Sequence, residues 1–249
     1  MTSTISEQSP LQLVVCGTDT DVGKTVVSAL LVQGLGASYW KPVQSGLSEG
    51  SDRQQVIKLL NLPEQRWIPE AYVFQAPVSP HWAAERESKR INPAHLRLPS
   101  VTSPLVVECA GGLLVPLTRD WLQIDQLERW RLPIVLVAHS GLGTLNHTLL
   151  SLEALKRRDL PVLGLILNGP CHADNPRTLE QLGNVPVLAQ LPPLNPLNAE
   201  TLQREWQQQN LGPKFKAVLT QARTEHEPPT DMGNPCSHPA LRRHPCSVH

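Results

Sequence analysis

The sequence predicts an α/β protein in which helices cover both faces of a mostly parallel β-sheet. Two observations lead to this fold class. Short apolar runs alternate with segments of helical spacing along the chain, which is typical of parallel strands joined by helical crossovers. The runs are also continuously apolar, as in LVVECA at 105–110 and PIVLVA at 133–138, so both sides of these strands are expected to be buried. We therefore expect three layers, with the sheet in the middle.

The predicted elements follow one another in a regular order. Strands are expected at the apolar runs Leu11–Cys16, Ser38–Val43, Leu105–Ala110, Pro133–Ala138, Pro161–Asn168 and Val185–Gln190. Helices are expected at Val26–Leu35, Asp52–Leu60, Glu85–Leu98 (interrupted near Pro93), Ile124–Trp130, Asn146–Arg158 and Leu202–Asn210. Ser51 is the candidate N-cap of the second helix. The connection that contains Pro63, Pro69, Pro77 and Pro80 has no clear assignment.

Composition limits the domain organisation and the classes of partner. The 249 residues suit a single α/β domain over 11–224, after a polar lead-in at 1–10. The tail at 225–249 is rich in Pro, His and Cys and is expected to be disordered, and its Cys and His spacings match no standard zinc site. With 22 basic and 22 acidic residues, no footprint for nucleic acid or a membrane surface is expected. No apolar run could span a membrane, no secretory signal is recognisable, and cysteines inside buried strands suit a reducing cytoplasm.

The stretch Gly17-Thr-Asp-Thr-Asp-Val-Gly-Lys-Thr25 is the strongest functional motif in the chain. It joins the first predicted strand to the first predicted helix, which is the context of a P-loop and favours a P-loop NTPase-type fold. Its glycines let backbone N–H groups point inward around phosphates, and the helix N-terminus adds a positive end. Lys24 would reach the outer phosphates, and the Thr25 hydroxyl would bind Mg²⁺. Five residues rather than the usual four separate Gly17 from Gly23, so the loop is enlarged. A solvated strand-to-helix connector is the simpler alternative.

Polar side chains gather where the predicted strands end, which is the edge at which ligands bind in open α/β sheets. Lys41 ends the second strand, Asp52 opens the next helix, Glu108 lies in the third strand, and Asn168 ends the fifth. Asp52 and Glu108 are candidates to complete Mg²⁺ coordination with Thr25, because Mg²⁺ prefers oxygen ligands. Simpler roles stay open for each residue. Asp52 could cap its helix, Glu108 could pair with an arginine, Lys41 could be a surface lysine, and Asn168 could be a turn residue.

At this point the motifs resemble those of a known family, the dethiobiotin synthetases. The resemblance rests on the enlarged loop at 17–25, Lys41-Pro-Val-Gln-Ser-Gly46, Ser51-Asp52, Glu108-Cys-Ala-Gly-Gly112 with Pro116, and Gly143-Thr-Leu-Asn-His-Thr148. It covers the chain from about residue 11 to residue 210. What it implies is an ATP- and Mg²⁺-dependent cyclo-ligase of biotin biosynthesis. Such enzymes convert 7,8-diaminononanoate and CO₂ to dethiobiotin through an N-carbamate and a carbamic-phosphoric anhydride.

The resemblance also implies roles for individual residues. Lys41 would be the active-site lysine, with Lys24 as the second catalytic lysine, and Ser45 would contact the diamine. Mg²⁺ would be held by Thr25, Asp52 and Glu108. The nucleotide would be bound by Thr20, Asp21, Val22, Gly23, Lys24, Thr25, Asp52, Glu108, Cys109, Ala110, Gly111, Asn168, Gly169, Pro192, Pro193 and Leu194. The family works as a homodimer, and the helix opening near Asn146 would close the partner's substrate site.

Two departures and two alternatives accompany this resemblance. Asp21 stands where a glutamate is common, and Cys109 replaces a usual glycine, but neither change removes a charge or a donor.

A regulatory or partitioning ATPase of the same P-loop branch is one alternative. Such proteins usually carry an extra lysine early in the loop, where this chain has Thr18, Asp19 and Thr20. The other is a cobyrinic acid-type amidoligase domain, for which the chain leaves no room for a glutamine-hydrolysing domain.

Overall fold

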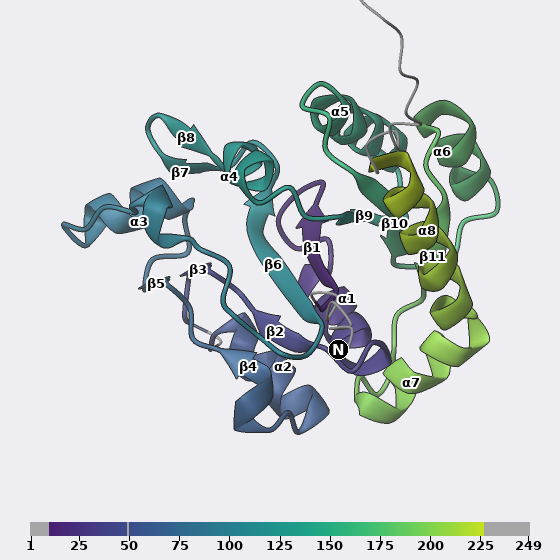
Figure 1. Cartoon of the computed structure of the whole chain (residues 1–249), viewed down its shortest axis with the longest axis horizontal. Coiled ribbons are helices and arrows are strands. Elements are labelled where there is room, and N and C mark those ends of the chain that lie inside the picture. Colours follow the sequence, from purple (N-terminus) through teal and green to yellow (C-terminus); the bar gives the residue numbers. More distant parts are fainter. Residues whose placement is uncertain (1–9, 49, 227–249) are drawn as a thin grey trace, which may run out of the picture.

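The computed structural model describes residues 10–48 and 50–226. A parallel sheet of seven strands, in the order β11-β10-β9-β1-β6-β2-β4, forms the centre of the molecule (Figure 1). Its strands are β1 (Gln12–Gly17), β2 (Ser38–Trp40), β4 (Trp67–Ile68), β6 (Leu105–Gly112), β9 (Ile134–His139), β10 (Val162–Asn168) and β11 (Val187–Leu191). Two short two-stranded sheets lie beside it: β3 (Val43–Ser45) with β5 (Tyr72–Phe74), and β7 (Pro116–Thr118) with β8 (Trp121–Leu122).

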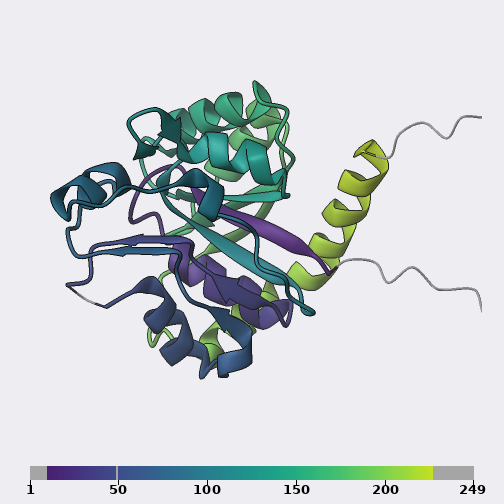
Figure 2. The same cartoon turned by 60° about the vertical axis from the view of Figure 1, so that its left-hand side comes forward.

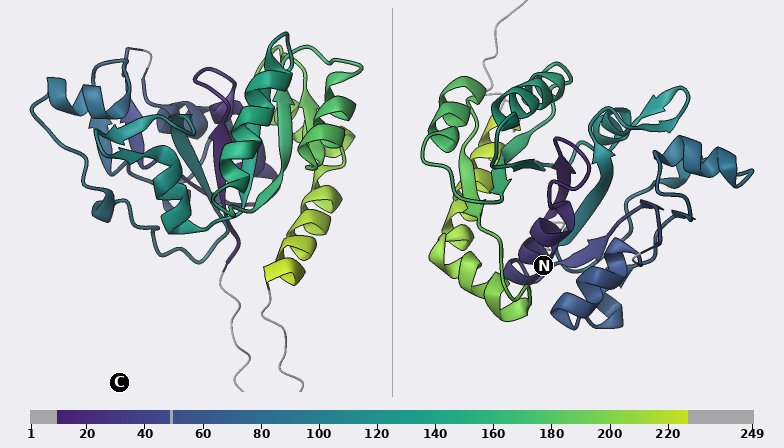
Figure 3. Two further views of the ribbon diagram at one scale, coloured as in Figure 1. Left: turned by 90° about the horizontal axis from the view of Figure 1, so that it is seen from above. Right: turned by 180° about the vertical axis from the view of Figure 1, so that it is seen from behind.

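Helices cover both faces of the sheet, as the sequence predicts. Apolar side chains of one face pack against α1 (Lys24–Gly34), α2 (Asp52–Leu60), α7 (Ala199–Gln208) and α8 (Leu211–His226). Those of the other face pack against α4 (Gln123–Trp130), α5 (Thr144–Lys156) and α6 (Asn175–Gly183). A third, smaller core lies around α3 (Pro80–Arg86), β3 and β7. Figures 2 and 3 show α3 and α8 at opposite ends of the molecule. None of the described helices is both long and apolar enough to cross a bilayer.

The predicted strands and most predicted helices are present, with boundaries shifted by a few residues. The main error is the helix expected over Glu85–Leu98. The helix there is α3, which starts at Pro80 and ends at Arg86, and Ser88 then adopts a left-handed φ of 52°. Only a 3₁₀ turn over Pro93–His95, capped by the Asn92 side chain, follows before β6. Proline suits the first turn of a helix, since its missing N–H is unpaired there anyway, so Pro80 marks a start rather than a break.

Several other boundaries differ from the prediction. The strand expected over Ser38–Val43 is divided into β2 and β3, because Pro42 has no N–H to donate to a neighbouring strand. Helix α6 and the β7–β8 hairpin were not predicted, and α7 is not the last helix because α8 follows it. Helix α8 extends to His226, two residues into the segment predicted as a tail at 225–249. The remaining tail, 227–249, and most of the lead-in lie outside the described residues.

Candidate active site

The P-loop lies where β1 passes into α1, beside the carboxyl ends of β6 and β2. Gly23 directly precedes the helix and has a φ of 94°, a left-handed conformation that favours glycine. A Cβ atom at Gly23 would lie only 2.1 Å from Nδ2 of Asn168, so the loop is packed directly against that side chain. Asn168 also donates from Nδ2 to the Val22 carbonyl oxygen at 3.1 Å. Asn168 is therefore more than a turn residue, because its side chain supports the loop.

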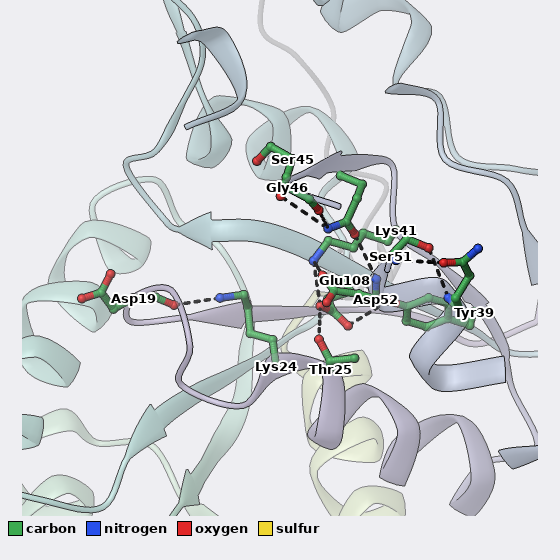
Figure 4. Close-up of polar contacts among 12 residues, drawn as sticks. Asp19, Lys24, Thr25, Tyr39, Lys41, Ser45, Gly46, Ser51, Asp52 and Glu108 are labelled. Carbon is green, nitrogen blue, oxygen red and sulfur yellow. Dashed lines mark hydrogen bonds and ion pairs between the residues drawn. The ribbon is translucent and has the colours of Figure 1, made fainter. Parts of the chain in front are cut away.

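Lys24 is the first residue of α1 and is mostly buried. Its Nζ donates to the Asp19 carbonyl oxygen at 2.7 Å, across the loop (Figure 4). Burial, followed by the positive charge of Lys41, lowers the pKa of Lys24. The negative charge of Glu108 acts in the opposite direction, so Lys24, Lys41 and Glu108 influence one another across the site. Such an environment is suited to a ligand that carries several negative charges.

Lys41 lies between two carboxylates in the centre of the site (Figure 4). Its Nζ contacts Asp52 Oδ2 and donates to Glu108 Oε1 at 2.9 Å, and its side chain is only 6% exposed. The alternative of a surface lysine is therefore wrong. Glu108 is fully buried, and its charge partner is Lys41 rather than an arginine.

Two hydroxyl groups complete the environment of Glu108. Thr25 Oγ1 donates to Oε1 at 2.9 Å, and the Tyr39 hydroxyl donates to Oε2 at 2.9 Å. Burial, then the charge of Glu108, raises the pKa of Tyr39 well above its usual value, so this hydroxyl keeps its proton. Both carboxylate oxygens of Glu108 are thus hydrogen-bonded, which is what makes a fully buried carboxylate tolerable.

The two carboxylates outweigh the effect of burial on the pKa of Lys41. Burial by itself would lower the pKa of Lys41, but the negative charges of Glu108 and Asp52 raise it above that of a free lysine. Lys41 is consequently an ammonium ion at physiological pH. It can stabilise negative charge on a reacting group, but it cannot act as a general base.

The register of two strands places Lys41 at the site, and a local capping motif places Asp52 there. Tyr39 and Trp40 of β2 pair with Val106 and Val107 of β6, and continuing this register brings Lys41 beside Glu108. Asp52 is the first residue of α2, where Ser51 and Gln54 form a capping box. Because Ser51 is the cap, Asp52 is free to pair with Lys41, and the alternative of a capping aspartate is wrong.

A cleft of about 690 Å³ opens over these groups. Predicted site residues that line it are Thr20, Asp21, Gly23, Lys24, Thr25, Lys41, Ser45, Asp52, Glu108, Ala110 and Gly111. Predicted residues that do not line it are Val22, Cys109, Asn146, Asn168, Gly169, Pro192, Pro193 and Leu194. Cys109 is a buried core residue, and its Sγ lies 3.4 Å from that of Cys16.

Residues 168, 169 and 192–194 of the second set share a location beside the P-loop. Asn168 pairs with Leu191 at the ends of the adjacent strands β10 and β11, and Gly169 N–H donates to the Leu191 carbonyl oxygen at 2.8 Å. Residues 192–194 follow directly on β11. These residues therefore gather at the end of the sheet next to the loop, which Asn168 contacts.

Sequence reasoning placed Gln44 at the end of the second strand without giving it a role, and it missed two further contributors to the cleft and its surroundings. Gln44 lines the cleft, and its Oε1 accepts the Asp52 N–H at 3.2 Å. Residues 77–80, from the unassigned proline-rich connection, form part of the wall. Tyr39 is hidden beneath the cleft against Glu108. Its position two residues before Lys41 was the available signal, because residues i and i+2 of a strand share one face.

The fold and the cleft define a P-loop nucleotide-binding protein of the three-layer α/β class. Residues 11–201 match the model of a family described as an AAA domain (AAA_26). The ATP-dependent dethiobiotin synthetase BioD of Rhodopseudomonas palustris (strain HaA2) is 50% identical over 196 residues, which are 79% of this chain and 92% of that protein. The chain belongs to the ATP-dependent dethiobiotin synthetase family.

Further relatives agree with this assignment. The protein of the same name from Brucella ovis is 48% identical over 191 residues, covering 77% of this chain and 90% of that protein. Among solved structures, the septum site-determining protein MinD of Pyrococcus horikoshii, complexed with Mg-ADP, has a TM-score of 0.52. The match covers 88% of this chain and 98% of MinD at 16% identity, and this likeness concerns the fold alone.

Proposed function

We propose that this protein catalyses the ATP-dependent closure of the ureido ring of dethiobiotin, from 7,8-diaminononanoate and CO₂, in biotin biosynthesis. The observation that carries the proposal is Lys41, held as an ammonium ion by two carboxylates in the same cleft as the enlarged P-loop. This arrangement occurs in a chain half identical to proteins named as dethiobiotin synthetases. The enzyme is a cyclo-ligase that forms carbon–nitrogen bonds.

The reaction needs stabilisation of negative charge more than acid–base chemistry. CO₂ first adds to one amine to give an N-carbamate, and the γ-phosphoryl group of ATP then moves onto a carbamate oxygen. The second amine attacks the carbonyl carbon of this mixed anhydride, releasing phosphate and closing the ring. Phosphoryl transfer of this kind depends on positioning and electrostatics.

The residues of the cleft suit these steps. Lys24, the loop N–H groups and the N-terminus of α1 bind the phosphates, with Thr20 at the rim. Lys41 neutralises the carbamate oxygen and the moving phosphoryl group. Ser45, which also lines the cleft, contacts the diamine. Residues 168–169 and 192–194, beside the loop, bind the base of the nucleotide.

The donors also fit Mg²⁺. Thr25 Oγ1 and Glu108 Oε1 are 2.9 Å apart, which is about the spacing of adjacent ligands around an octahedral ion with bonds near 2.1 Å. Asp52 lies on the other side of Lys41. Phosphate and water oxygens would supply the remaining ligands. When bound, Mg²⁺ neutralises charge on the phosphates, and Thr25, Asp52 and Glu108 would hold it.

We also propose that the protein acts as a homodimer in the cytoplasm, with residues 11–224 as one domain. The start of α5 supports the dimer. Asn146 and Leu150 are exposed and four residues apart in α5, so they lie along one side of the helix, and Asn146 does not line the cleft of its own chain. Leu142, in the turn that precedes the helix, is also exposed. The closely spaced free thiols Cys16 and Cys109 suit a reducing compartment. Light scattering after gel filtration should give the mass of two chains, and the mass of one chain would refute the dimer.

Product analysis tests the proposed activity. Purified protein should form dethiobiotin, identified by mass spectrometry, when ATP, Mg²⁺, bicarbonate and 7,8-diaminononanoate are all present. Omission of the diamine should reduce ATP hydrolysis to background. Comparable hydrolysis without the diamine would instead favour a regulatory or partitioning ATPase. The gene should also restore growth of a biotin-requiring strain that dethiobiotin rescues.

A further inference from the structure

Tyr39 is fully buried and is not assigned a role by the reaction, yet its hydroxyl contacts the carboxylate at the centre of the site. It donates to Glu108 Oε2 at 2.9 Å, across 69 positions of the sequence. Tyr39 pairs with Val106 in the sheet, two residues before Glu108 on the same face of β6. Neighbouring strands of the sheet therefore hold both the tyrosine ring and the carboxylate in place.

The two oxygens of Glu108 have different partners. Oε1 receives hydrogen bonds from Lys41 and Thr25. In the proposed function these two side chains also interact with the carbamate and with Mg²⁺, respectively. Oε2 receives its hydrogen bond from Tyr39, which lies in the apolar core beneath the cleft and does not line it. The contact with Tyr39 is thus the one that ligand binding has no reason to break.

We propose that Tyr39 is a positioning residue that fixes the rotamer of Glu108 so that Oε1 faces the Thr25 hydroxyl and a nucleotide-bound Mg²⁺. This inference rests on the proposed role of Glu108 as a magnesium ligand. Outer-shell hydrogen bonds orient the groups that bind a metal, and losing such a bond typically lowers metal affinity by about 10- to 100-fold.

The test is the Mg²⁺ dependence of nucleotide binding, measured by calorimetry with the non-hydrolysable analogue β,γ-methylene-ATP. Tyr39→Phe removes only the hydroxyl. In this variant the affinity for Mg²⁺ in the presence of the analogue should fall by about 10- to 100-fold. Its affinity for the analogue without Mg²⁺ should stay within about twofold of wild type, because the loop and Lys24 are untouched. If Tyr39 only stabilised the fold, Tyr39→Phe would weaken the binding of Mg²⁺ and also the binding of the analogue without Mg²⁺.

Tyr72→Phe is the matched control. The Tyr72 hydroxyl is bonded to Asn92 N–H at 3.0 Å, away from the cleft, so this variant should bind Mg²⁺ and the analogue as wild type does. A double-mutant cycle with Glu108→Gln adds a second measurement. If Tyr39 acts through Glu108, adding Tyr39→Phe to Glu108→Gln should change the Mg²⁺ affinity by less than about twofold.

The outcomes separate the inference from the proposed function. If wild-type protein binds the analogue equally with and without Mg²⁺, the proposed magnesium role fails, and the inference fails with it. If the wild type responds to Mg²⁺ and Tyr39→Phe responds equally, only the inference is refuted. Additive losses in the double-mutant cycle would also refute it.

Discussion

Replacing Lys41 by glutamine is the most informative single change, because it removes the charge between two carboxylates and keeps a somewhat shorter polar side chain that can donate hydrogen bonds. Lys41 pairs with Glu108, which has no exposed surface, and with Asp52, which is partly exposed. In the variant these two carboxylates face each other across a neutral amide. We expect a loss of stability and a separate, larger loss of turnover.

The stability loss follows from the burial of the pair. Breaking a buried ion pair by removing one partner typically costs about 3–5 kcal/mol. Glutamine can still donate to one carboxylate, and Thr25 and Tyr39 still donate to Glu108, so we expect about 3 kcal/mol, at the low end of that range. For a chain of this size that corresponds to a decrease in Tm of about 6–12 °C.

The sign of the pH dependence follows from the raised pKa of Lys41. A lysine whose folded-state pKa is raised contributes its full stabilisation below the unfolded-state pKa, about 10.4. That contribution is lost only as the pH rises through the folded-state value. The difference in Tm between wild type and Lys41→Gln should therefore be the same at about pH 7 and about pH 9.

Turnover should fall by about 10²- to 10³-fold, the usual effect of removing one group that stabilises transition-state charge. ATP affinity should change only a few-fold, because the P-loop and Lys24 remain. Single-turnover assays and calorimetry measure the two separately. Lys89→Gln is the control, since Lys89 forms an exposed pair with Glu87 and such pairs contribute little. A Lys41→Gln protein with near wild-type turnover would refute the assigned role, and an unchanged Tm would refute the energetic argument.

Three further predictions can be checked on the same protein. Gly23→Ala should abolish ATP binding in calorimetry, because the added methyl overlaps the asparagine packed on the loop; Gly36→Ala, also at positive φ but with open space, should bind ATP normally. Peptide mapping after iodoacetamide treatment should show rapid labelling of exposed Cys171 and very slow labelling of Cys16, because burial, with the neighbouring thiol, raises the pKa of Cys16 and keeps it protonated. Deletion of 227–249 should leave turnover and Tm unchanged, since the described core contacts of α8 precede it; a large loss of either would contradict this.

Elements with a strong local signal were predicted well. The continuously apolar strands, the enlarged loop and the Ser51 cap are each specified by residues close together in the chain, so the amino-acid sequence is enough to locate them. The helix expected over 85–98 was wrong because the prediction there relied on local spacing alone. Its residues have helical spacing, but Ile91 and Leu96 are buried through contacts with distant parts of the chain in the core around α3. Periodicity cannot distinguish such contacts from those of a helix.

The sequence alone therefore determined the class of fold, the phosphate-binding loop and the identity of the charged groups at the strand ends. Only the tertiary structure decided how those groups are paired. The sequence indicated both carboxylates as magnesium ligands, with an arginine pair for Glu108 and a capping role for Asp52 as alternatives. The structure pairs both carboxylates with Lys41 and adds a hydrogen bond from Tyr39. The physical reason is the register of β2 against β6, which brings residues about 70 positions apart into contact. That register depends on the packing of the whole sheet rather than on any local motif.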